Sequence, residues 1–395
     1  KYQRYYDHIL VDEFQDTNTA QYALLRQLAK LNHNLYAVGD PDQSVYRWRG
    51  ADYRNVRRFQ EDYPDAHTIL LEENYRSTQL ILDAAMAVID LHPGRTRKQL
   101  FTQRKGGVEI FAYEAYNEEE EAQFVVGEAE RLVKEEGLKL MDCAVMYRIN
   151  AQSRALEEAC LRYGTPYKLV GGVRFYQRRE VKDVIAYLRL VQNPEDEVSL
   201  RRVINVPQRG IGQRSLDDLT LWARAQGISP YAAIQRALQE RDSGQPPTHP
   251  LASRAVQALA SFHQMLSEIA AQRTEGNVVD LLDLVLERTG YKQYLLTNEG
   301  GEERWENILE LRGVAQEFAS EELSEGLPRL LDRLALVSDV DSYDEKKDAL
   351  TLITLHQAKG LEFPVVFVTG MEDGLLPHKR SLEDPSELEE ERRLC

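Results

Sequence analysis

Short apolar runs that stop abruptly at polar clusters constrain the fold of this chain more than any other feature. The runs at residues 8–11, 35–38 and 68–71 are each followed within two residues by charged side chains. Runs of this length predict buried strands, and the helical stretches between them are typical of a parallel sheet. Because open parallel sheets bind ligands beyond the carboxyl ends of their strands, the polar clusters are candidate functional residues.

The alternation of strands and helices continues to about residue 150, and a long helical region then interrupts it. Between residues 174 and 345, helices separated by glycine and proline replace the strand pattern. The other expected elements are a helix at 79–89 after the N-cap candidates Ser77 and Thr78, a strand at 108–113, a helix at 118–136, and strands at 143–147, 350–355 and 364–369. The predicted fold class is α/β, with parallel-sheet domains and an inserted all-α domain.

Length and composition exclude several classes of protein. At 395 residues the chain can form two or three domains with cores of their own. No run approaches the roughly eighteen apolar residues that a membrane-spanning helix needs. Cys143, Cys160 and Cys395 form no CxxC pair, which argues against a zinc site or a disulfide framework. We therefore expect a cytoplasmic protein with no membrane partner.

The charge of the chain is acidic overall but unevenly distributed. A net charge of −16 argues against a uniformly basic surface for nucleic acid. Between Arg174 and Arg214, however, there are nine Lys and Arg against five Asp and Glu, a local net charge of +4. The acidic runs at 114–121 and 383–391 have the composition of solvated helix faces. Any contact with nucleic acid should therefore be local.

Asp12 and Glu13 directly follow the first apolar run. In nucleotide hydrolysis, one carboxylate can hold Mg²⁺ beside the β and γ phosphates while another orients or deprotonates the attacking water. Adjacent carboxylates at a strand end suit this chemistry, with Asp12 as the metal ligand and Glu13 as the base. A lone Asp-Glu pair can also form an acidic turn that caps the next helix, so the assignment depends on its context.

Residues 39–50, which we name the aromatic loop, provide that context. In this loop Tyr46 and Trp48 alternate with Arg47 and Arg49. Flat rings can stack on unpaired bases and arginines can meet phosphates, as in sites that bind single strands. The alternative is that Trp48 packs in the core, but the flanking arginines argue against its full burial.

Five segments of the chain resemble successive motifs of superfamily 1 helicases of the UvrD/Rep/PcrA group. In chain order they are VDEFQDTN at 11–18, VGDPDQSVYRWRG at 38–50, ENYRST at 73–78, LITLHQAKGLEFP at 352–364 and GLLPH at 374–378. Five ordered motifs at family-like spacing extend over essentially the whole chain, which is far more specific than any one of them. The resemblance implies an ATP-driven motor with RecA-like domains, with ATP and Mg²⁺ as its cofactors.

The resemblance also assigns the predicted segments to domains. Residues 1–67 are expected to be the C-terminal part of the first RecA-like motor domain, 68–173 the first part of the second motor domain, 174–345 the inserted helical domain, and 346–395 the second part of the second motor domain.

On the nucleotide side, the resemblance implies roles for residues in several motifs. Gln43 and Arg76 match family residues that sense the γ-phosphate, and Arg76 resembles an arginine finger. Tyr75 matches the aromatic residue that stacks on adenine. Glu362 matches a carboxylate near the ribose, and Gly360 belongs to the same nucleotide-binding motif. The resulting catalytic candidates are Glu13, Gln43 and Arg76.

On the DNA side, the resemblance implies a path for a single strand. Tyr46, Trp48, Arg49 and His356 match positions that line this path. His356 ends a predicted strand, where a histidine is often only a hydrogen-bonded structural residue, so its role stays open.

Residues 204–212, which we name the glycine loop, resemble a family element that approaches the duplex backbone. Gly210 and Gly212 would let main-chain N–H groups come close to phosphates, while Arg209 and Arg214 would add charge without reading bases. An ordinary loop between two helices is the alternative.

The sequence also departs from the family. The phosphate-cradling pattern GxxxxGK[ST] occurs nowhere in it. We therefore expect a chain truncated at both ends that hydrolyses little ATP by itself. The parent protein should move 3′ to 5′ on single-stranded DNA and unwind duplex at junctions, with repair or replication proteins as possible partners. Two other hypotheses remain open, a non-catalytic DNA-binding module and the motor part of a helicase-nuclease subunit.

Overall fold

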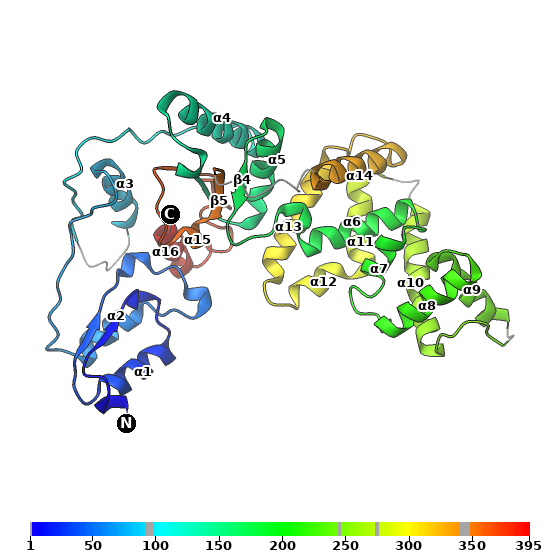
Figure 1. The fold of residues 1–395 in the computed structure, drawn as a ribbon, viewed down its shortest axis with the longest axis horizontal. Coiled ribbons are helices and arrows are strands. Elements are labelled where there is room, and N and C mark those ends of the chain that lie inside the picture. The colour runs from blue at the N-terminus through cyan, green and yellow to red at the C-terminus, as the bar shows by residue number, and fades with distance from the viewer. Residues whose placement is uncertain (1, 92–97, 244–245, 273–275, 340–347) are drawn as a thin grey trace. The chain divides into compact units, whose positions relative to one another are not determined.

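A computed structural model of the chain describes residues 2–91, 98–243, 246–272, 276–339 and 348–395 (Figure 1). The chain divides into two compact units. The first consists of Lys1–Arg148 together with Thr351–Cys395, and the second consists of Ile149–Leu350.

The first unit begins with two parallel strands connected by a helix. Strand β1, Ile9–Val11, pairs with β2, Leu35–Ala37, and α1, Thr19–Ala29, connects them. A capping box fixes the start of α1, because Asn18 and Gln21 each accept a backbone N–H of the other. The two strands end side by side, with Val11 opposite Ala37, so the polar residues that follow them become neighbours. Helix α2, Arg54–Asp62, follows the aromatic loop.

A second parallel sheet in this unit has β3, Cys143–Tyr147, as its middle strand. It pairs with β5, Leu350–Thr354, on one side and with β6, Val365–Val368, on the other. The buried side chains of β3 and β5 explain why both appear as continuous apolar runs in the sequence. The helices of this part of the unit are α3, Gln79–Ile89; α4, Glu118–Glu136; α15, Leu355–Ala358; and α16, Pro385–Leu394. The predicted parallel α/β class is confirmed.

Two predicted strands, at residues 68–71 and 108–113, are wrong. Both segments lack regular structure, and Ile69, Leu71 and Phe111 are largely exposed. Near the first segment the backbone pairing is an isolated bridge between Glu73 and Phe101. A strand needs a neighbouring backbone as well as an apolar pattern, and the pattern alone does not reveal whether a partner exists.

The second unit is mainly helical, and its helices run from green to orange in Figure 1. After α5, Ser153–Tyr163, and β4, Tyr167–Leu169, the helices are α6, Arg179–Gln192; α7, Glu197–Val203; α8, Gln213–Gln226; α9, Pro230–Ser243; α10, Ser253–Ala271; α11, Val278–Thr289; α12, Tyr291–Leu296; α13, Gly301–Gln316; and α14, Leu323–Asp339. A continuous apolar core contains Tyr187, Leu219, Phe262 and Leu311 from four of these helices. The proposed insertion, 174–345, falls inside this unit, although its end lies outside the described residues.

Two further observations concern membranes and thiols. Within the described residues, no helix combines the length and apolar character needed to cross a bilayer. Cys143 and Cys160 are buried, whereas Cys395 is exposed.

Candidate functional site

The carboxylates that follow β1 are held in a turn with their side chains directed away from the core. Glu13 has a left-handed backbone, with φ of 49° and ψ of 43°, and its N–H donates to Asp12 Oδ1 over 2.9 Å. Left-handed conformations are uncommon for residues other than glycine and concentrate at functional sites. The side chain of Glu13 is 57% exposed, so its carboxylate can meet a ligand.

The first part of the aromatic loop is a 3₁₀ turn, Pro41–Gln43, directly beyond β2. Asp40 caps this turn by accepting the N–H of Asp42 over 3.1 Å, and it also accepts from Gln43 Nε2 over 3.0 Å. Lys98 forms ion pairs with both Asp40 and Asp42. Gln43 therefore has a fixed side-chain position beside the end of β2.

Lys359, for which residue type and motif predicted no role in the site, connects the two polar clusters. Its ammonium group forms an ion pair with Asp16, lies 3.6 Å from Glu13 Oε2 and donates to the carbonyl of Gln43 over 2.8 Å. Glu13 and Gln43 thus share a cationic neighbour that comes from the segment after α15. Lys359 lies in one of the five motifs, but the sequence contains no signal for these partners, because Asp16 is 343 residues away.

Arg76 and Glu362 are also brought together. Arg76 Nε donates to Glu362 Oε2 over 2.7 Å, and both side chains are mostly exposed. Beside them in sequence, Tyr75 is exposed and its hydroxyl donates to Glu73 Oε2 over 2.9 Å. Gly360 has a φ of +85°, and a Cβ there would meet open space. The exposed ring of Tyr75 and the paired charges are accessible to a ligand.

The far part of the aromatic loop forms a second cluster with α15. Trp48 is 64% exposed, and the Arg49 guanidinium lies 4.5 Å from its ring and 5.4 Å from that of Tyr46. The ring of His356 meets Trp48 edge-on with 6.2 Å between centroids, and the Tyr46 hydroxyl donates to the His356 carbonyl over 2.9 Å. The structure therefore gathers Tyr46, Trp48, Arg49 and His356 into one cluster.

Burial gives His356 a distinctive charge state. Loss of solvent, with the nearby positive charge of Arg148 as a smaller cause, lowers the pKa of His356 to about 4. The imidazole is therefore neutral at pH 7. Its ring can contact an aromatic face or a base without adding positive charge to the cluster.

Helix α16 holds the middle of the aromatic loop. Arg393 Nε donates to the Ser44 carbonyl over 2.9 Å, and Glu390 Oε1 accepts the N–H of Arg47 over 3.1 Å. The Arg47 guanidinium donates to Ser386 Oγ over 2.8 Å. Between these contacts, a small apolar cluster consists of Val45, Leu355, Leu376 and Leu394. The loop is thus fixed between the two clusters that it connects.

In the glycine loop of the second unit, Arg209 makes hydrogen bonds within its own loop and to a neighbouring helix. The Arg209 guanidinium donates to the carbonyls of Val203 over 3.1 Å and Pro207 over 3.1 Å, and to the Tyr187 hydroxyl over 2.7 Å. Gly210 adopts a φ of +80°, which favours glycine, and it is exposed like Gly212. Arg209 therefore braces the loop from within.

Part of the positive charge between residues 174 and 214 is paired inside the second unit. Arg202 forms an ion pair with Asp183 over 2.7 Å, and Arg201 with Glu197 over 3.0 Å. The buried guanidinium of Arg178 donates to Asn307 Oδ1 over 2.7 Å and to Ser153 Oγ over 2.8 Å. In the part of the chain that the structure describes, exposed Arg214 has no such ion pair. Its charge is therefore available to an external anion.

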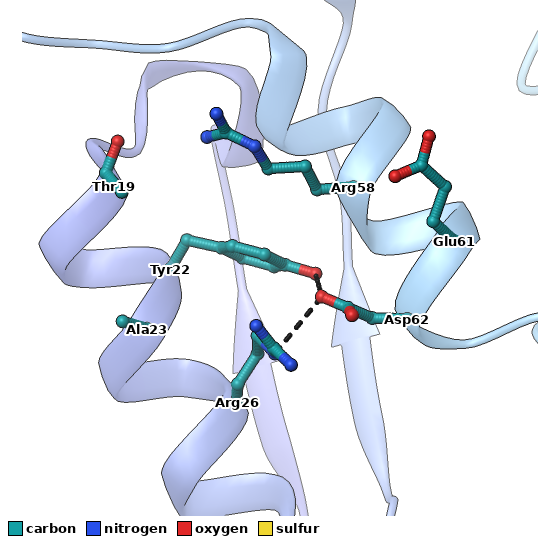
Figure 2. Close-up of a pocket in the computed structure, with 7 residues that line it drawn as sticks. All are labelled: Thr19, Tyr22, Ala23, Arg26, Arg58, Glu61 and Asp62. Carbon is teal, nitrogen blue, oxygen red and sulfur yellow. Dashed lines mark hydrogen bonds and ion pairs between the residues drawn. The ribbon is translucent and has the colours of Figure 1, made fainter.

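A pocket of about 250 Å³ lies between α1 and α2, away from these clusters (Figure 2). Figure 2 shows Tyr22 and Arg26 converging on Asp62, to which the Tyr22 hydroxyl donates over 2.6 Å and Arg26 pairs over 3.1 Å. The Arg58 guanidinium on its wall donates to Asp52 and Asn55. Each charged group on the pocket wall already has an ion-pair partner, either on the wall or just beyond it, so the pocket has the character of a packing gap between helices.

Comparisons with known proteins cover the whole chain. The UvrD/REP helicase N-terminal domain matches residues 1–64, and the UvrD-like helicase C-terminal domain matches residues 69–395. ATP-dependent DNA helicase PcrA of Bacillus subtilis is 45% identical over 402 residues, and ATP-dependent DNA helicase UvrD1 of Mycobacterium tuberculosis is 46% identical over 418 residues. PcrA of Staphylococcus aureus is 41% identical over 400 residues. In each case the whole chain aligns with 53% of the relative, so it spans about half the length of these curated relatives.

Proposed function

Because this chain belongs to the UvrD/Rep-type helicase family, we propose that the protein uses ATP hydrolysis to move along single-stranded DNA. The observation that carries the proposal is the aromatic loop. One end of it, at Gln43, lies beside the carboxylates that follow β1, and the other end carries half-buried Tyr46 and exposed Trp48. A loop that is fixed at both ends can transmit a change at a nucleotide to a strand.

For hydrolysis we propose roles that match the positions of the side chains. Glu13 orients or deprotonates the attacking water, while Gln43 and Arg76 contact the γ-phosphate. The exposed ring of Tyr75 stacks on adenine, and Glu362, with Gly360 beside it, meets the ribose. The ion pair between Arg76 and Glu362 supports one shared nucleotide surface, because it holds the proposed γ-phosphate contact beside the proposed ribose contact.

Asp12 is the proposed Mg²⁺ ligand. Within the described residues, no group of three His, Cys, Asp or Glu side chains could hold a metal ion by itself. This fits Mg²⁺ beside a nucleotide, which uses one or two carboxylates, phosphate oxygens and water. The bound ion would neutralise charge on the β and γ phosphates.

For DNA we propose two contact regions. Tyr46 and Trp48 stack on unpaired bases, with Arg49 and His356 beside them along the single-strand path. At a junction, the main-chain N–H groups of Gly210 and Gly212, with the charge of Arg214, contact the duplex backbone. Arg209 gives the glycine loop its shape.

The proposal also includes the direction of movement along DNA, the protein partners and the cellular location. We propose movement from 3′ to 5′, unwinding of duplex ahead of the motor, repair or replication proteins as partners and a cytoplasmic location. Strand displacement tests the direction, with duplexes that carry either a 3′ or a 5′ single-stranded tail. Displacement from the 3′-tailed duplex alone is expected, and displacement from the 5′-tailed duplex alone would reverse the proposed direction.

The central test is the rate of ATP hydrolysis by the full-length protein in the presence of single-stranded DNA. Glu13→Gln should lower this rate about 100- to 10,000-fold, because it removes the base. The control is Glu61→Gln, which changes an exposed carboxylate in a surface pair with Arg57. Equal rates for wild type and Glu13→Gln would remove the catalytic role and favour a DNA-binding module.

A further inference from the structure

Gln15 lies between the proposed base and the aromatic loop. Its side chain is completely buried, at 0% exposure. Its Nε2 donates to Glu13 Oε2 over 2.5 Å, and its Oε1 accepts the N–H of Asp40 over 3.0 Å. The carbonyl of Gln15 accepts from the hydroxyl of Ser44 over 3.4 Å. One buried residue thus contacts the carboxylate after β1 and two positions of the aromatic loop.

Only one orientation of the Gln15 amide satisfies both of its partners. A carboxylate can only accept from it, and a main-chain N–H can only donate to it. Rotating the amide by half a turn would place its oxygen against the Glu13 carboxylate and its NH₂ group against the N–H of Asp40. The hydrogen-bonding pattern therefore fixes the amide group and, through it, the carboxylate of Glu13.

The aromatic loop lies very close to Gln15 at Gly39. A Cβ at Gly39 would lie 2.4 Å from Gln15 Oε1 and 3.0 Å from the backbone nitrogen of Phe14. The glycine thus lets the end of β2 pack directly on the amide. Any shift of the loop at Gly39 or Asp40 would displace Gln15 and so change the support of Glu13.

We propose that Gln15 is a positioning residue, which holds the Glu13 carboxylate where it orients the attacking water and ties that position to the aromatic loop. This inference rests on the proposed function, since it assumes that Glu13 is the base. Gln15 itself touches neither nucleotide nor DNA in this scheme. It acts through Glu13, so its loss should slow the chemical step and leave the binding of ATP largely intact.

Two variants separate the two hydrogen bonds of the amide. Gln15→Met has a similar volume and removes both bonds, whereas Gln15→Glu keeps an acceptor for the N–H of Asp40 and loses the donor to Glu13. Both should lower kcat for DNA-stimulated ATP hydrolysis about 10- to 100-fold, because a small misplacement of a catalytic group is costly. KM for ATP should change little. The matched control, Gln27→Glu, makes the same chemical change at an exposed position of α1.

A double variant distinguishes positioning from a general structural role. If Gln15 acts through Glu13, adding Gln15→Met to Glu13→Gln should not lower the residual rate further, as measured over hours with labelled ATP. A further loss as large as that in the wild-type background would overturn the inference. So would a wild-type kcat in both folded single variants. Should Gln15→Met fail to fold, Gln15→Glu carries the test by its kcat and KM.

The failure of this inference can be told apart from the failure of the proposed function. If Glu13→Gln hydrolyses ATP at the wild-type rate, the proposed function fails and Gln15 has no base to position. If Glu13→Gln is inactive while the Gln15 variants keep the wild-type kcat, only the positioning role is lost. Thermal unfolding of each variant excludes global destabilisation as the cause of a lower rate.

Discussion

The aromatic loop and the glycine loop use arginine in opposite ways. In the aromatic loop, Arg49 lies over the exposed ring of Trp48, and both are accessible to a ligand. In the glycine loop, the guanidinium of Arg209 is directed inward to main-chain carbonyls and to the Tyr187 hydroxyl. An arginine near glycines and aromatic residues can thus be a contact for a ligand or a brace for its own loop, and its hydrogen-bond partners distinguish the two.

The difference follows from how each loop is supported. The glycine loop is closed by its own side chains, since Asn205 Oδ1 accepts the N–H groups of Arg209 over 2.8 Å and Ile211 over 3.2 Å. The aromatic loop is held from outside, by α16 at Ser44 and Arg47. External support leaves the ring of Trp48, at its far end, exposed to a ligand.

The largest expected effect tests whether Arg209 stabilises the glycine loop through its hydrogen bonds. Arg209→Met should lower the free energy of unfolding of the second unit by about 2 to 3 kcal/mol, because carbonyls and a hydroxyl lose their donor. Urea unfolding followed by circular dichroism measures this loss. The control, Arg214→Met, should stay within about 0.5 kcal/mol of wild type, as exposed substitutions usually do. If Arg209→Met were as stable as that control, the two loops would not differ in the way described.

The next effect concerns the pH dependence of the cluster beside the aromatic loop. Burial lowers the pKa of His356 from 6.5 to about 4, so between these values the unfolded chain binds a proton that the folded protein does not. Stability from this group is complete above about pH 6.5 and falls as the pH drops toward 4, by at most about 3 kcal/mol. Unfolding midpoints across this range should show a smaller decline for His356→Asn. The control is His67→Asn, which changes an exposed histidine and should decline like wild type. If the unfolding midpoint of His356→Asn declined as much as those of wild type and of this control, the burial of the imidazole would be contradicted.

A smaller effect is expected for the exposed ring of the aromatic loop. Trp48→Ala should weaken binding of single-stranded DNA by about 1 to 3 kcal/mol through lost base stacking, with little change in stability. Fluorescence anisotropy of a labelled oligonucleotide measures the affinity. The control Trp305→Ala changes a tryptophan of the second unit that pairs with Lys292. Unaltered affinity in a folded Trp48→Ala protein would refute the stacking role.

The smallest effect separates Arg214 from Arg209 at the duplex. Arg214→Met should weaken duplex binding equally for all sequences and reduce the slope of affinity against salt concentration by about 1, as expected for one lost phosphate contact. Affinity measured at several salt concentrations gives this slope. If duplex affinity fell only for particular DNA sequences, Arg214 would contact bases. That result would contradict the proposal that Arg214 contacts only the phosphate backbone.

The sequence predicted the parts of the fold that depend on local pattern. The helix at 118–136 and the strand at 143–147 match α4 and β3 residue for residue, because a capped amphipathic helix and a continuous apolar run are strong local signals. The expected strands at 68–71 and 108–113 were wrong, because pairing depends on a neighbour that the local pattern does not specify.

For the site, the motifs pointed to side chains but not to their supports. Asp12, Glu13, Gln43 and Trp48 stand out by residue type and position. The roles of Gln15 and Lys359 depend on partners that only the folded chain brings near, such as Asp40 and Asp16. The inward direction of Arg209 likewise depends on the Tyr187 hydroxyl and on local carbonyls. Such contacts are tertiary, so residue type and spacing do not predict them.

The most direct test of the account is the stimulation of ATP hydrolysis by single-stranded DNA in the full-length protein, compared between wild type and Trp48→Ala at saturating DNA. If the aromatic loop joins the nucleotide to the strand, the ratio of rates with and without DNA should fall toward one in the variant. If the ratio keeps its wild-type value once DNA is saturating, the loop binds the strand without transmitting its presence, and the central claim is contradicted.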